Sequence, residues 1–542
     1  MTQLTGGEAI VRSLIGLGVD TIFGLPGVQN DALFNALHDN REQIRIIHTR
    51  HEQGAAYMAM GYALSSEKPG IYAVVPGPGL LNTTAALSTA YATNAKVLCL
   101  AGQIATDLIG KNVGVLHEIP DQLGVIRSLT KWAQRVPSQT AVPDLMVEAF
   151  SQLYSGRPRP VGLEMPMDIL AKTGEVDVTG LEFEVRKPSL DLDQIEAAAK
   201  LLGEAKRPLI FVGSGATHAR EEIQALAEML QAPVIPGRNG RGILSNRHYL
   251  GMAPTDGYQL WEKADVVIGI GARMYRPLSR WGLDDDIKII RIDIDSGTHD
   301  VVAPPAVGIV ADSQEATAAL LNAIPKHNRS RPSRKEEMLA YKAEMAALYA
   351  QLEPQQSFIN VIRDELPDDG IFVEEVTQIG FAAQFMLPIY NPRSFIATGY
   401  QGTLGFGFAT ALGVKVANPD RKVLAVAGDG GFMFNVQELA TAVQHQIGLV
   451  TILFNDGAFG NVRRMQKELY DNRLIASKLQ NPDFVQLAHA FGAQGLRATN
   501  PEEMRHAIRQ GFAEKGPTLI EVPVGEMPSP WPISFPPPNR GV

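Results

Sequence analysis

Two aspartates in the last third of the chain have the type and spacing to hold a cation. Asp429 lies in Gly428-Asp429-Gly430 at the end of one apolar run, and Asp456 lies in an Asn-Asp-Gly turn at the end of the next. Carboxylate oxygens are the hard ligands that divalent cations prefer, and a cation held this way can bind a phosphate group. The neighbouring glycines let the backbone approach a ligand closely. The pair therefore predicts a divalent cation that holds a phosphate.

The elements around these aspartates explain why they should meet. The two apolar runs are typical of β-strands, and one helix-length segment, which we expect to begin near Phe434, separates them. Parallel strands joined by a helix lie side by side, with their carboxyl ends at the edge where α/β proteins bind ligands. The amides at the start of the helix could receive a phosphate. On the motif alone, a tight turn with a capping aspartate remains the alternative.

The overall composition favours a large cytoplasmic enzyme. The chain has 542 residues, enough for three or four domains, and its 45% hydrophobic content supports sizeable cores. The net charge of −9 argues against nucleic acid as the main partner. No apolar run reaches membrane-spanning length, and the N-terminus lacks the basic and apolar regions of a signal peptide. We therefore expect a cytoplasmic protein with no nucleic-acid or membrane partner.

The single cysteine, Cys99, agrees with a reducing compartment. It lies in the apolar run VLCLAG, and one cysteine allows no disulfide within the chain. This setting predicts a buried strand residue rather than a reactive nucleophile.

Alternating apolar runs and amphipathic segments predict an α/β fold with three doubly wound parallel sheets. The first block covers residues 1–185, the second 186–337 and the third 338–525, and a C-terminal tail follows at 526–542. The first and third blocks share a coarse plan, which leaves a duplicated domain open.

Two segments lack a regular pattern. The basic segment KHNRSRPSRKEE at 326–337 is short, contains Pro332 and belongs to an acidic chain, so it predicts a solvated linker rather than a nucleic-acid patch. The tail EMPSPWPISFPPPNRGV is too rich in proline for regular structure. It is either a disordered end or the cover of a neighbouring surface.

The chain as a whole resembles the thiamine diphosphate-dependent enzymes, and within them the acetolactate synthase-like branch. The two aspartate motifs and the intervening helix resemble the diphosphate-binding motif of that family. Five further segments are similar to the same branch: RHEQGAAYMAMGYA at 50–63, GPGLLNTTAALSTAYATNAKVLCLAGQ at 77–103, MPMDIL at 165–170, IDID at 292–295 and GYQGTLGFGFATALG at 399–413. The resemblance covers nearly all of the chain in the right order.

The resemblance implies a domain plan and an assembly. Residues 1–185 would form a pyrimidine-binding domain, 186–337 a central Rossmann-like domain and 338–525 a diphosphate-binding domain. The implied cofactors are thiamine diphosphate and Mg²⁺, and the implied substrates are small 2-oxo acids and carbonyl compounds. The cofactor would lie between the first domain of one subunit and the third domain of its partner. A homodimer is therefore the minimum, and a homotetramer is favoured.

Glu52 is the residue on which the implied mechanism depends. In the family, the glutamate of this motif bonds the ring nitrogen of the aminopyrimidine and so promotes loss of the proton from the thiazolium carbon. On its own, a glutamate in RHEQGAA is more often a charge on a helix surface. Leu404 falls where the family places a bulky apolar residue under the bent cofactor.

The resemblance also implies the metal ligands and the cofactor contacts. The ligands would be Asp429, Asp456 and the backbone carbonyl of Ala458. Most relatives carry asparagine at the position of Asp456, so the aspartate adds a negative charge beside the diphosphate, and we expect shifted metal selectivity and pH dependence. The implied cofactor contacts are Pro26, Gly27, Glu52, Asn82, Thr377, Gly402, Leu404, Gly428, Gly430, Gly431 and Gly460.

His117 is the second candidate catalytic residue. It lies where acetolactate synthases usually carry glutamine beside the reaction centre, and a histidine there suits proton transfer, with a structural role as the alternative. The adjacent His-His pair of pyruvate decarboxylases is absent from the chain. Val75 and Pro76 occupy the stretch where benzoylformate decarboxylases carry a histidine. These absences argue against a simple decarboxylase of either type.

The central block resembles a flavin-binding domain in outline only. It keeps RPLIFVGSG and the GAR at 271–273, but GMAPTDG at 251–257 replaces the usual histidine-containing pattern, with Asp256 near that place. The segment 274–281 also departs from the pattern. FAD, an adenine nucleotide and no ligand are the alternatives, and the departures argue against FAD.

The expected function is decarboxylation of a 2-oxo acid such as pyruvate, followed by transfer of the two-carbon unit to a carbonyl acceptor. A simple 2-oxo acid decarboxylase, an aldehyde lyase and a diketone hydrolase are the alternatives within the family. A flavin-dependent oxidoreductase is an alternative of another class, but the GxGxxG fingerprint that it predicts is absent. A non-catalytic subunit is a further alternative, and the presence of Glu52 argues against it.

Overall fold

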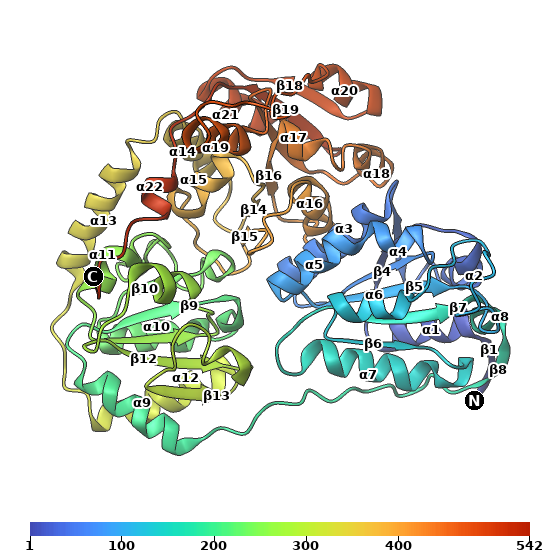
Figure 1. Cartoon of the computed structure of the whole chain (residues 1–542), viewed down its shortest axis with the longest axis horizontal. Coiled ribbons are helices and arrows are strands. Elements are labelled where there is room, and N and C mark those ends of the chain that lie inside the picture. The colour runs from blue at the N-terminus through green and yellow to red at the C-terminus, as the bar shows by residue number, and fades with distance from the viewer. Residues whose placement is uncertain (542) are drawn as a thin grey trace.

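The computed structural model describes residues 1–541, whose strands form three parallel sheets and one two-stranded antiparallel pair. The sheets belong to three bodies that follow one another along the chain (Figure 1). The N-terminal body is blue to cyan, the central body green, and the C-terminal body orange to red. This confirms the predicted fold class of three parallel-sheet α/β domains. The boundaries at residues 185, 337 and 525 stay predictions.

The N-terminal sheet has six parallel strands in the order β3-β2-β4-β5-β7-β6. Its strands are β2 (Thr21–Gly24), β3 (Arg45–His48), β4 (Gly70–Val74), β5 (Val97–Gln103), β6 (Trp132–Arg135) and β7 (Val161–Pro166). Its helices are α1 (Gly6–Gly16), α2 (Asp31–Asp39), α3 (Glu52–Ser65), α4 (Pro78–Asn82), α5 (Thr84–Thr93), α6 (Gln122–Leu129), α7 (Val142–Tyr154) and α8 (Met167–Ala171). The antiparallel pair of β1 (Thr2–Thr5) and β8 (Thr173–Val176) joins the two ends of this body.

The central sheet has five parallel strands in the order β10-β9-β11-β12-β13, a doubly wound arrangement. Its strands are β9 (Leu209–Val212), β10 (Val234–Pro236), β11 (Val266–Ile270), β12 (Lys288–Asp293) and β13 (Val307–Val310). Its helices are α9 (Leu192–Glu204), α10 (Arg220–Leu230), α11 (Gly257–Glu262) and α12 (Ser313–Ala323). An extended segment connects β8 to α9 and runs along the lower edge of the molecule in Figure 1.

The C-terminal sheet has six parallel strands in the order β15-β14-β16-β17-β19-β18. Its strands are β14 (Ile371–Val373), β15 (Phe395–Ile396), β16 (Val423–Gly428), β17 (Val450–Asn455), β18 (Gln494–Arg497) and β19 (Thr518–Pro523). Its helices are α13 (Lys335–Tyr349), α14 (Gln355–Glu365), α15 (Gln378–Met386), α16 (Phe406–Ala417), α17 (Asp429–Phe432), α18 (Glu438–Gln444), α19 (Gly460–Leu469), α20 (Phe484–Phe491), α21 (Pro501–Ala513) and α22 (Trp531–Ser534). Its strand order, counted along the chain, repeats that of the N-terminal sheet.

Helices α3 and α16 join the N-terminal and C-terminal bodies through one shared hydrophobic core. The contact brings the two backbones very close at two glycines. A Cβ atom on Gly61 would lie 2.1 Å from the carbonyl oxygen of Thr410, and one on Gly413 would lie 1.9 Å from that of Met58. Any side chain at these positions would force the helices apart. The packing fixes α3, which begins at Glu52, against the C-terminal body.

The two segments without a regular pattern both pack on the protein. In the basic segment, Arg331 donates to the carbonyl oxygens of Leu202 and Gly203 near the end of α9, so the expected solvated linker is in part a helix cap. The tail crosses from the C-terminal to the central body. Trp531 donates to Asn461, and the Arg540 guanidinium bonds Ala264 and pairs with Asp284. Of the two alternatives for the tail, the structure shows the cover of neighbouring surfaces.

In residues 1–541, none of the helices is both long and apolar enough to cross a membrane.

Candidate active site

Three neighbouring strands of the C-terminal sheet end at one cavity. β14, β16 and β17 are adjacent and parallel, and their carboxyl ends lead to Thr377, Asp429 and Asp456. The cavity has a volume of about 270 Å³. Ten of the sequence-predicted residues line it: Thr377, Gly402, Leu404, Gly428, Asp429, Gly430, Gly431, Asp456, Ala458 and Gly460.

The segment between the two aspartates differs from the single helix expected from Phe434. A short helix, α17, starts directly at Asp429, and α18 begins only at Glu438. Between them, the Asn435 side chain donates to the carbonyl oxygen of Gly405, which holds this stretch against the loop before α16. The prediction of one helix is therefore wrong. Tertiary hydrogen bonds of Asn435 and Glu438 stabilise the interruption.

The carboxylate of Asp456 has a defined set of partners. Its Oδ1 accepts from the amide of Ala458 at 3.2 Å, and its Oδ2 accepts from Gln378 Nε2 at 2.8 Å. Burial, and after it the negative charge of Asp429, raises the pKa of Asp456 to about 6. Gly460 leaves room for this carboxylate, because a Cβ there would lie 2.5 Å from Oδ2.

Gln378 is oriented by contacts on its other amide atom. Its Oε1 accepts from the amide of Met527 at 2.8 Å and from the guanidinium of Arg464 at 3.3 Å. Because Oε1 faces two donors, Nε2 is the atom that faces Asp456. Thr377, the residue before Gln378, caps the start of α15 by accepting from the amides of Ile379 and Gly380.

Asn481 holds the Asp429 carboxylate by a hydrogen bond from its side-chain amide, as Gln378 holds that of Asp456. Its side-chain amide donates to Asp429 Oδ2 at 2.6 Å and to Asn455 Oδ1 at 2.9 Å. Asn455 in turn donates to Glu521 on β19 at 2.8 Å. Sequence reasoning did not find Gln378 or Asn481, since single amide residues outside a motif carry no signal.

Glu52, at the first turn of α3, has one oxygen bonded and one without a bonded partner in residues 1–541. Oε2 accepts from Asn82 Nδ2 at 2.9 Å, so Asn82 bonds the proposed catalytic carboxylate. The start of α3 is held in place because the buried Glu438 carboxylate accepts from the amides of Arg50 and His51. The half-buried side chain of Glu52 is therefore fixed from two sides.

The ring of His117 is held by Gln29. Its Nδ1 lies 3.0 Å from Gln29 Oε1, and Gln29 Nε2 donates to the carbonyl oxygen of Leu116 at 3.1 Å. Because Gln29 presents an acceptor, Nδ1 of His117 is the donor in this bond. The backbone of His117 has φ of 68°, a strained conformation for this residue. Gly77 makes room for it, since a Cβ there would lie 2.5 Å from the His117 carbonyl oxygen.

The predicted site residues fall into two groups. Glu52, Asn82 and His117 lie at the carboxyl edge of the N-terminal sheet, together with Pro26 and Gly27, which follow β2. We call the cavity that contains Asp429 and Asp456 the carboxylate cavity. Among residues 1–541, those that line it all belong to the C-terminal body. One chain thus carries two separate groups of predicted site residues, which we call half-sites.

A second cavity, of about 350 Å³, opens at the carboxyl edge of the central sheet. Its lining includes the turns after β9 and β11, Gly213 and Gly271, and the side chains of Arg238, Arg273 and Arg276. Asp256 does not line it. This aspartate is buried, accepts from Tyr349 Oη and the amide of Ala253, and has its pKa raised to about 6 by burial.

The chemistry of the first cavity fits a divalent cation with a diphosphate. Asp429, Asp456 and Ala458 all line it, and Asp429 is close enough to raise the pKa of Asp456. No cluster of three or more His, Cys, Asp and Glu side chains suited to a metal occurs within residues 1–541, so the remaining ligands of a cation here would be oxygens of a bound phosphate and of water.

The fold and the two half-sites define a class of cofactor-dependent α/β enzymes, and family models identify it. Residues 4–125 match the thiamine pyrophosphate enzyme N-terminal TPP binding domain, 195–320 the central domain and 375–522 the C-terminal TPP binding domain. The chain belongs to the thiamine pyrophosphate enzyme family. The predicted family membership is therefore confirmed, and the chain is a thiamine diphosphate-dependent enzyme.

Full-length relatives place the chain within that family. It is 34% identical to a probable 2-ketoarginine decarboxylase of Pseudomonas aeruginosa, over 96% of this chain and 94% of that protein. It is 32% identical to a probable acetolactate synthase large subunit of Methanocaldococcus jannaschii, over 96% of this chain and 92% of that protein. It is 30% identical to the acetolactate synthase isozyme 1 large subunit of Escherichia coli, over 96% and 94%. The chain lies in the branch that contains these proteins.

Proposed function

We propose that the protein is a thiamine diphosphate- and Mg²⁺-dependent enzyme that decarboxylates a 2-oxo acid such as pyruvate and transfers the remaining unit to a carbonyl acceptor. One observation carries the proposal. Two carboxylates at adjacent strand ends face a glycine-lined cavity, and each is held by an oriented amide, Gln378 or Asn481. Aspartates that only cap tight turns would not need a side-chain amide to orient them.

The residues of the carboxylate cavity would bind the diphosphate end of the cofactor. Asp429, Asp456 and the Ala458 carbonyl would hold Mg²⁺, and Leu404 would support the rings from below. When bound, thiamine diphosphate supplies an acidic carbon that adds to a carbonyl group and takes up the electrons released with CO₂. Glu52 would hold a proton through its free Oε1 while Asn82 keeps Oε2 in place.

His117 would move protons at the reacting end of the site. Its Nδ1–H is engaged by Gln29, so Nε2 of the neutral ring can accept a proton from a substrate hydroxyl and return it. The strained backbone of His117 agrees with a functional role.

The protein would work as a homodimer at least, and as a homotetramer by family likeness. The two half-sites of one chain each lie beside exposed apolar side chains, which a partner subunit could cover. Those beside Glu52 and His117 are Val28, Leu81, Val113 and Leu116, and those beside the carboxylate cavity are Met433, Phe434, Val462 and Met465. A site would then form from the Glu52 half of one subunit and the Asp429 half of its partner. The single buried Cys99 and the acidic charge favour the cytoplasm.

Two kinds of alternative are separated by simple measurements. A decarboxylase, aldehyde lyase or diketone hydrolase of the same family would share the cofactor site and differ in products. A flavin-dependent oxidoreductase would show visible flavin absorption in the purified protein. A non-catalytic subunit is disfavoured because Glu52 and its partner Asn82 are both in place.

The test is a screen of 2-oxo acids and aldehyde acceptors with thiamine diphosphate and Mg²⁺, with CO₂ and products measured by mass spectrometry. We expect CO₂ release from at least one 2-oxo acid, its loss with EDTA and its recovery with Mg²⁺. Full activity in dialysed, metal-free protein would overturn the metal assignment.

A further inference from the structure

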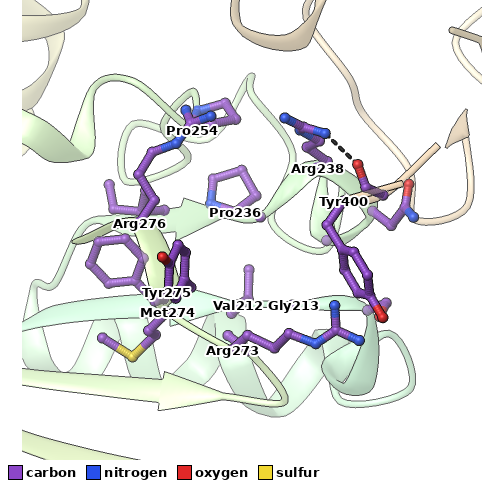
Figure 2. A pocket seen from close by; sticks show the side chains of 18 of the residues that line it. Val212, Gly213, Pro236, Arg238, Pro254, Arg273, Met274, Tyr275, Arg276 and Tyr400 are labelled. Atoms are coloured by element: carbon purple, nitrogen blue, oxygen red, sulfur yellow. Dashed lines mark hydrogen bonds between the residues drawn. The ribbon is translucent and has the colours of Figure 1, made fainter. Parts of the chain in front are cut away.

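A third cavity lies between the carboxylate cavity and the cavity at the edge of the central sheet, which we call the central cavity. Its volume is about 320 Å³, and three arginines line it: Arg238, Arg276 and Arg280. We name this space the arginine cleft. It shares Val376, Phe381 and Gly402 with the carboxylate cavity, so a substrate that reacts with a cofactor bound there could extend directly into the cleft. Towards the central cavity it shares Arg238, Arg276 and Tyr400, whose placement Figure 2 shows.

The positive charges of the arginine cleft are not balanced by ion pairs. Within residues 1–541, none of its three arginines forms a salt bridge. Arg238 donates to the carbonyl oxygen of Gly399, and the Arg276 guanidinium lies 4.6 Å from the centre of the Phe535 ring. Burial, and after it repulsion from Arg238, lowers the pKa of Arg276 to about 10. Two cations that repel each other in a half-buried space are costly without an anion.

One acid lines the cleft and does not cancel this charge. Glu374 is buried at the end of β14 and accepts from Gln384. Burial raises the pKa of Glu374 to about 7, so it is partly protonated at neutral pH. Three arginines and one partly protonated carboxyl group give the cleft a net positive charge. The rest of its lining includes the aromatic rings of Tyr275, Tyr400 and Phe535, together with the polar residues Gln384 and Thr398.

We propose that the arginine cleft binds a second, distal anionic group of the substrate, so that the enzyme acts on a 2-oxo acid with a negative charge at its far end. The aromatic walls would contact the carbon chain, and the guanidinium groups would donate charge-assisted hydrogen bonds to a terminal carboxylate or phosphate. This inference rests on the proposed function, because it takes the end of the carboxylate cavity at Gly402 and Leu404 as the place of the cofactor rings.

The positive charge of the arginine cleft is unfavourable for a substrate that ends in a guanidinium group. The relative from Pseudomonas aeruginosa is described as a probable 2-ketoarginine decarboxylase, and a 2-ketoarginine side chain carries a positive charge at its far end. Placed among Arg238, Arg276 and Arg280, that charge would be repelled. The proposal therefore separates this chain from the activity in that relative's name.

Substrates that differ only at the far end test the proposal. The probes are 2-oxoglutarate, its terminal amide, and 2-oxoarginine, each with thiamine diphosphate and Mg²⁺. We expect kcat/KM to be highest for 2-oxoglutarate, roughly ten- to hundredfold above the amide, which has the same shape without the charge. A preference for 2-oxoarginine or equal rates for all three would overturn the proposal.

Variants assign that preference to the arginines. Arg276→Met should lower kcat/KM for 2-oxoglutarate by a much larger factor than kcat/KM for its amide, while Arg276→Lys should keep part of the advantage of 2-oxoglutarate. Arg329→Met, an exposed arginine of the basic segment, is the control and should behave as the parent. An equal loss for both substrates in Arg276→Met would show a structural role and contradict the inference.

Binding measurements keep the test independent of turnover. Calorimetry of 2-oxoglutarate against the protein without cofactor should show binding that Arg276→Met loses. If the parent turns over 2-oxo acids but does not bind 2-oxoglutarate, only this inference fails. If no 2-oxo acid is turned over while 2-oxoglutarate still binds through Arg276, the proposed function fails instead. The anion could also be a nucleotide phosphate, and ADP binding lost in Arg276→Met with unchanged substrate preference would assign the arginines to a nucleotide and overturn the proposal.

Discussion

At the residue scale, Asp456 lies where the family resemblance predicts an asparagine, and its contacts show how a second carboxylate is held at this place. Its negative charge lies beside that of Asp429, and Gln378 donates a hydrogen bond to its Oδ2. Arg464, which is buried without an acidic partner in residues 1–541, donates to the other end of the same amide. These hydrogen bonds orient the Asp456 carboxylate, while burial and the charge of Asp429 still raise its pKa to about 6.

Substituting Gln378 should weaken metal binding more than it weakens the fold. Residues that orient metal ligands typically contribute ten- to hundredfold in affinity, so we expect Gln378→Ala to lower Mg²⁺ affinity by roughly tenfold. The measurement is a titration of Mg²⁺ in the presence of thiamine diphosphate, followed by calorimetry. Gln356→Ala, which breaks only a bond between Gln356 and Asn360 on α14, is the matched control. Unchanged Mg²⁺ affinity in Gln378→Ala would show that this amide does not position Asp456.

The sequence could identify Asp429 and Asp456 because each follows an apolar run and a glycine-rich turn. It could not identify Gln378, whose role depends on the tail returning to place Met527 beside it, 149 residues later. Nor could it show that Asn82, expected as a cofactor contact, bonds Glu52. Partners of this kind are defined by tertiary contacts between distant segments.

At the element scale, the packing of α3 on α16 determines where Glu52 lies. The strands were predictable, since apolar runs mark them, but the packing of α3 on α16 was not. The interruption between α17 and α18 was not, because local propensity favours one helix and the bond from Asn435 to Gly405 overrides it. The glycines of the helix contact were visible in the sequence, but their partners across the interface were not.

Adding one methyl group at the α3–α16 contact should test this packing. In Gly413→Ala the new Cβ would lie 1.9 Å from the Met58 carbonyl oxygen, so the helices must separate. We expect a destabilisation of roughly 1–3 kcal/mol and a lower melting temperature. Gly516→Ala is the control, because a Cβ there meets nothing within 4 Å. A melting temperature equal to that of the control would mean that the contact is looser than the structure shows.

At the scale of the whole molecule, the two bodies with the same strand order share one hydrophobic core, and a proline-rich tail ties the C-terminal body to the central one (Figure 1). The three-sheet plan was predictable from the order of strands and helices. The course of the tail was not, because its contacts are single bonds to distant surfaces. The division of the site into two half-sites leads to the proposed dimer.

Mixing two inactive variants should reveal a shared site. Glu52→Gln damages one half-site and Asp429→Ala the other, and we expect each homodimer to be inactive. If sites form between subunits, exchange of subunits gives hybrid dimers in which one site carries both substitutions and the other carries neither. Activity should therefore appear in the mixture. A mixture that stays inactive after verified subunit exchange would place both half-sites of each active centre in the same chain.

The central claim is that Glu52 drives cofactor chemistry on a 2-oxo acid. The most direct measurement is CO₂ release by the parent and by Glu52→Gln, with thiamine diphosphate binding measured on the same samples. We predict cofactor- and Mg²⁺-dependent CO₂ release by the parent. We also predict its loss by at least a hundredfold in Glu52→Gln, in line with removal of an acid–base group, with cofactor binding retained but weaker. Near-parental CO₂ release by Glu52→Gln would contradict the account.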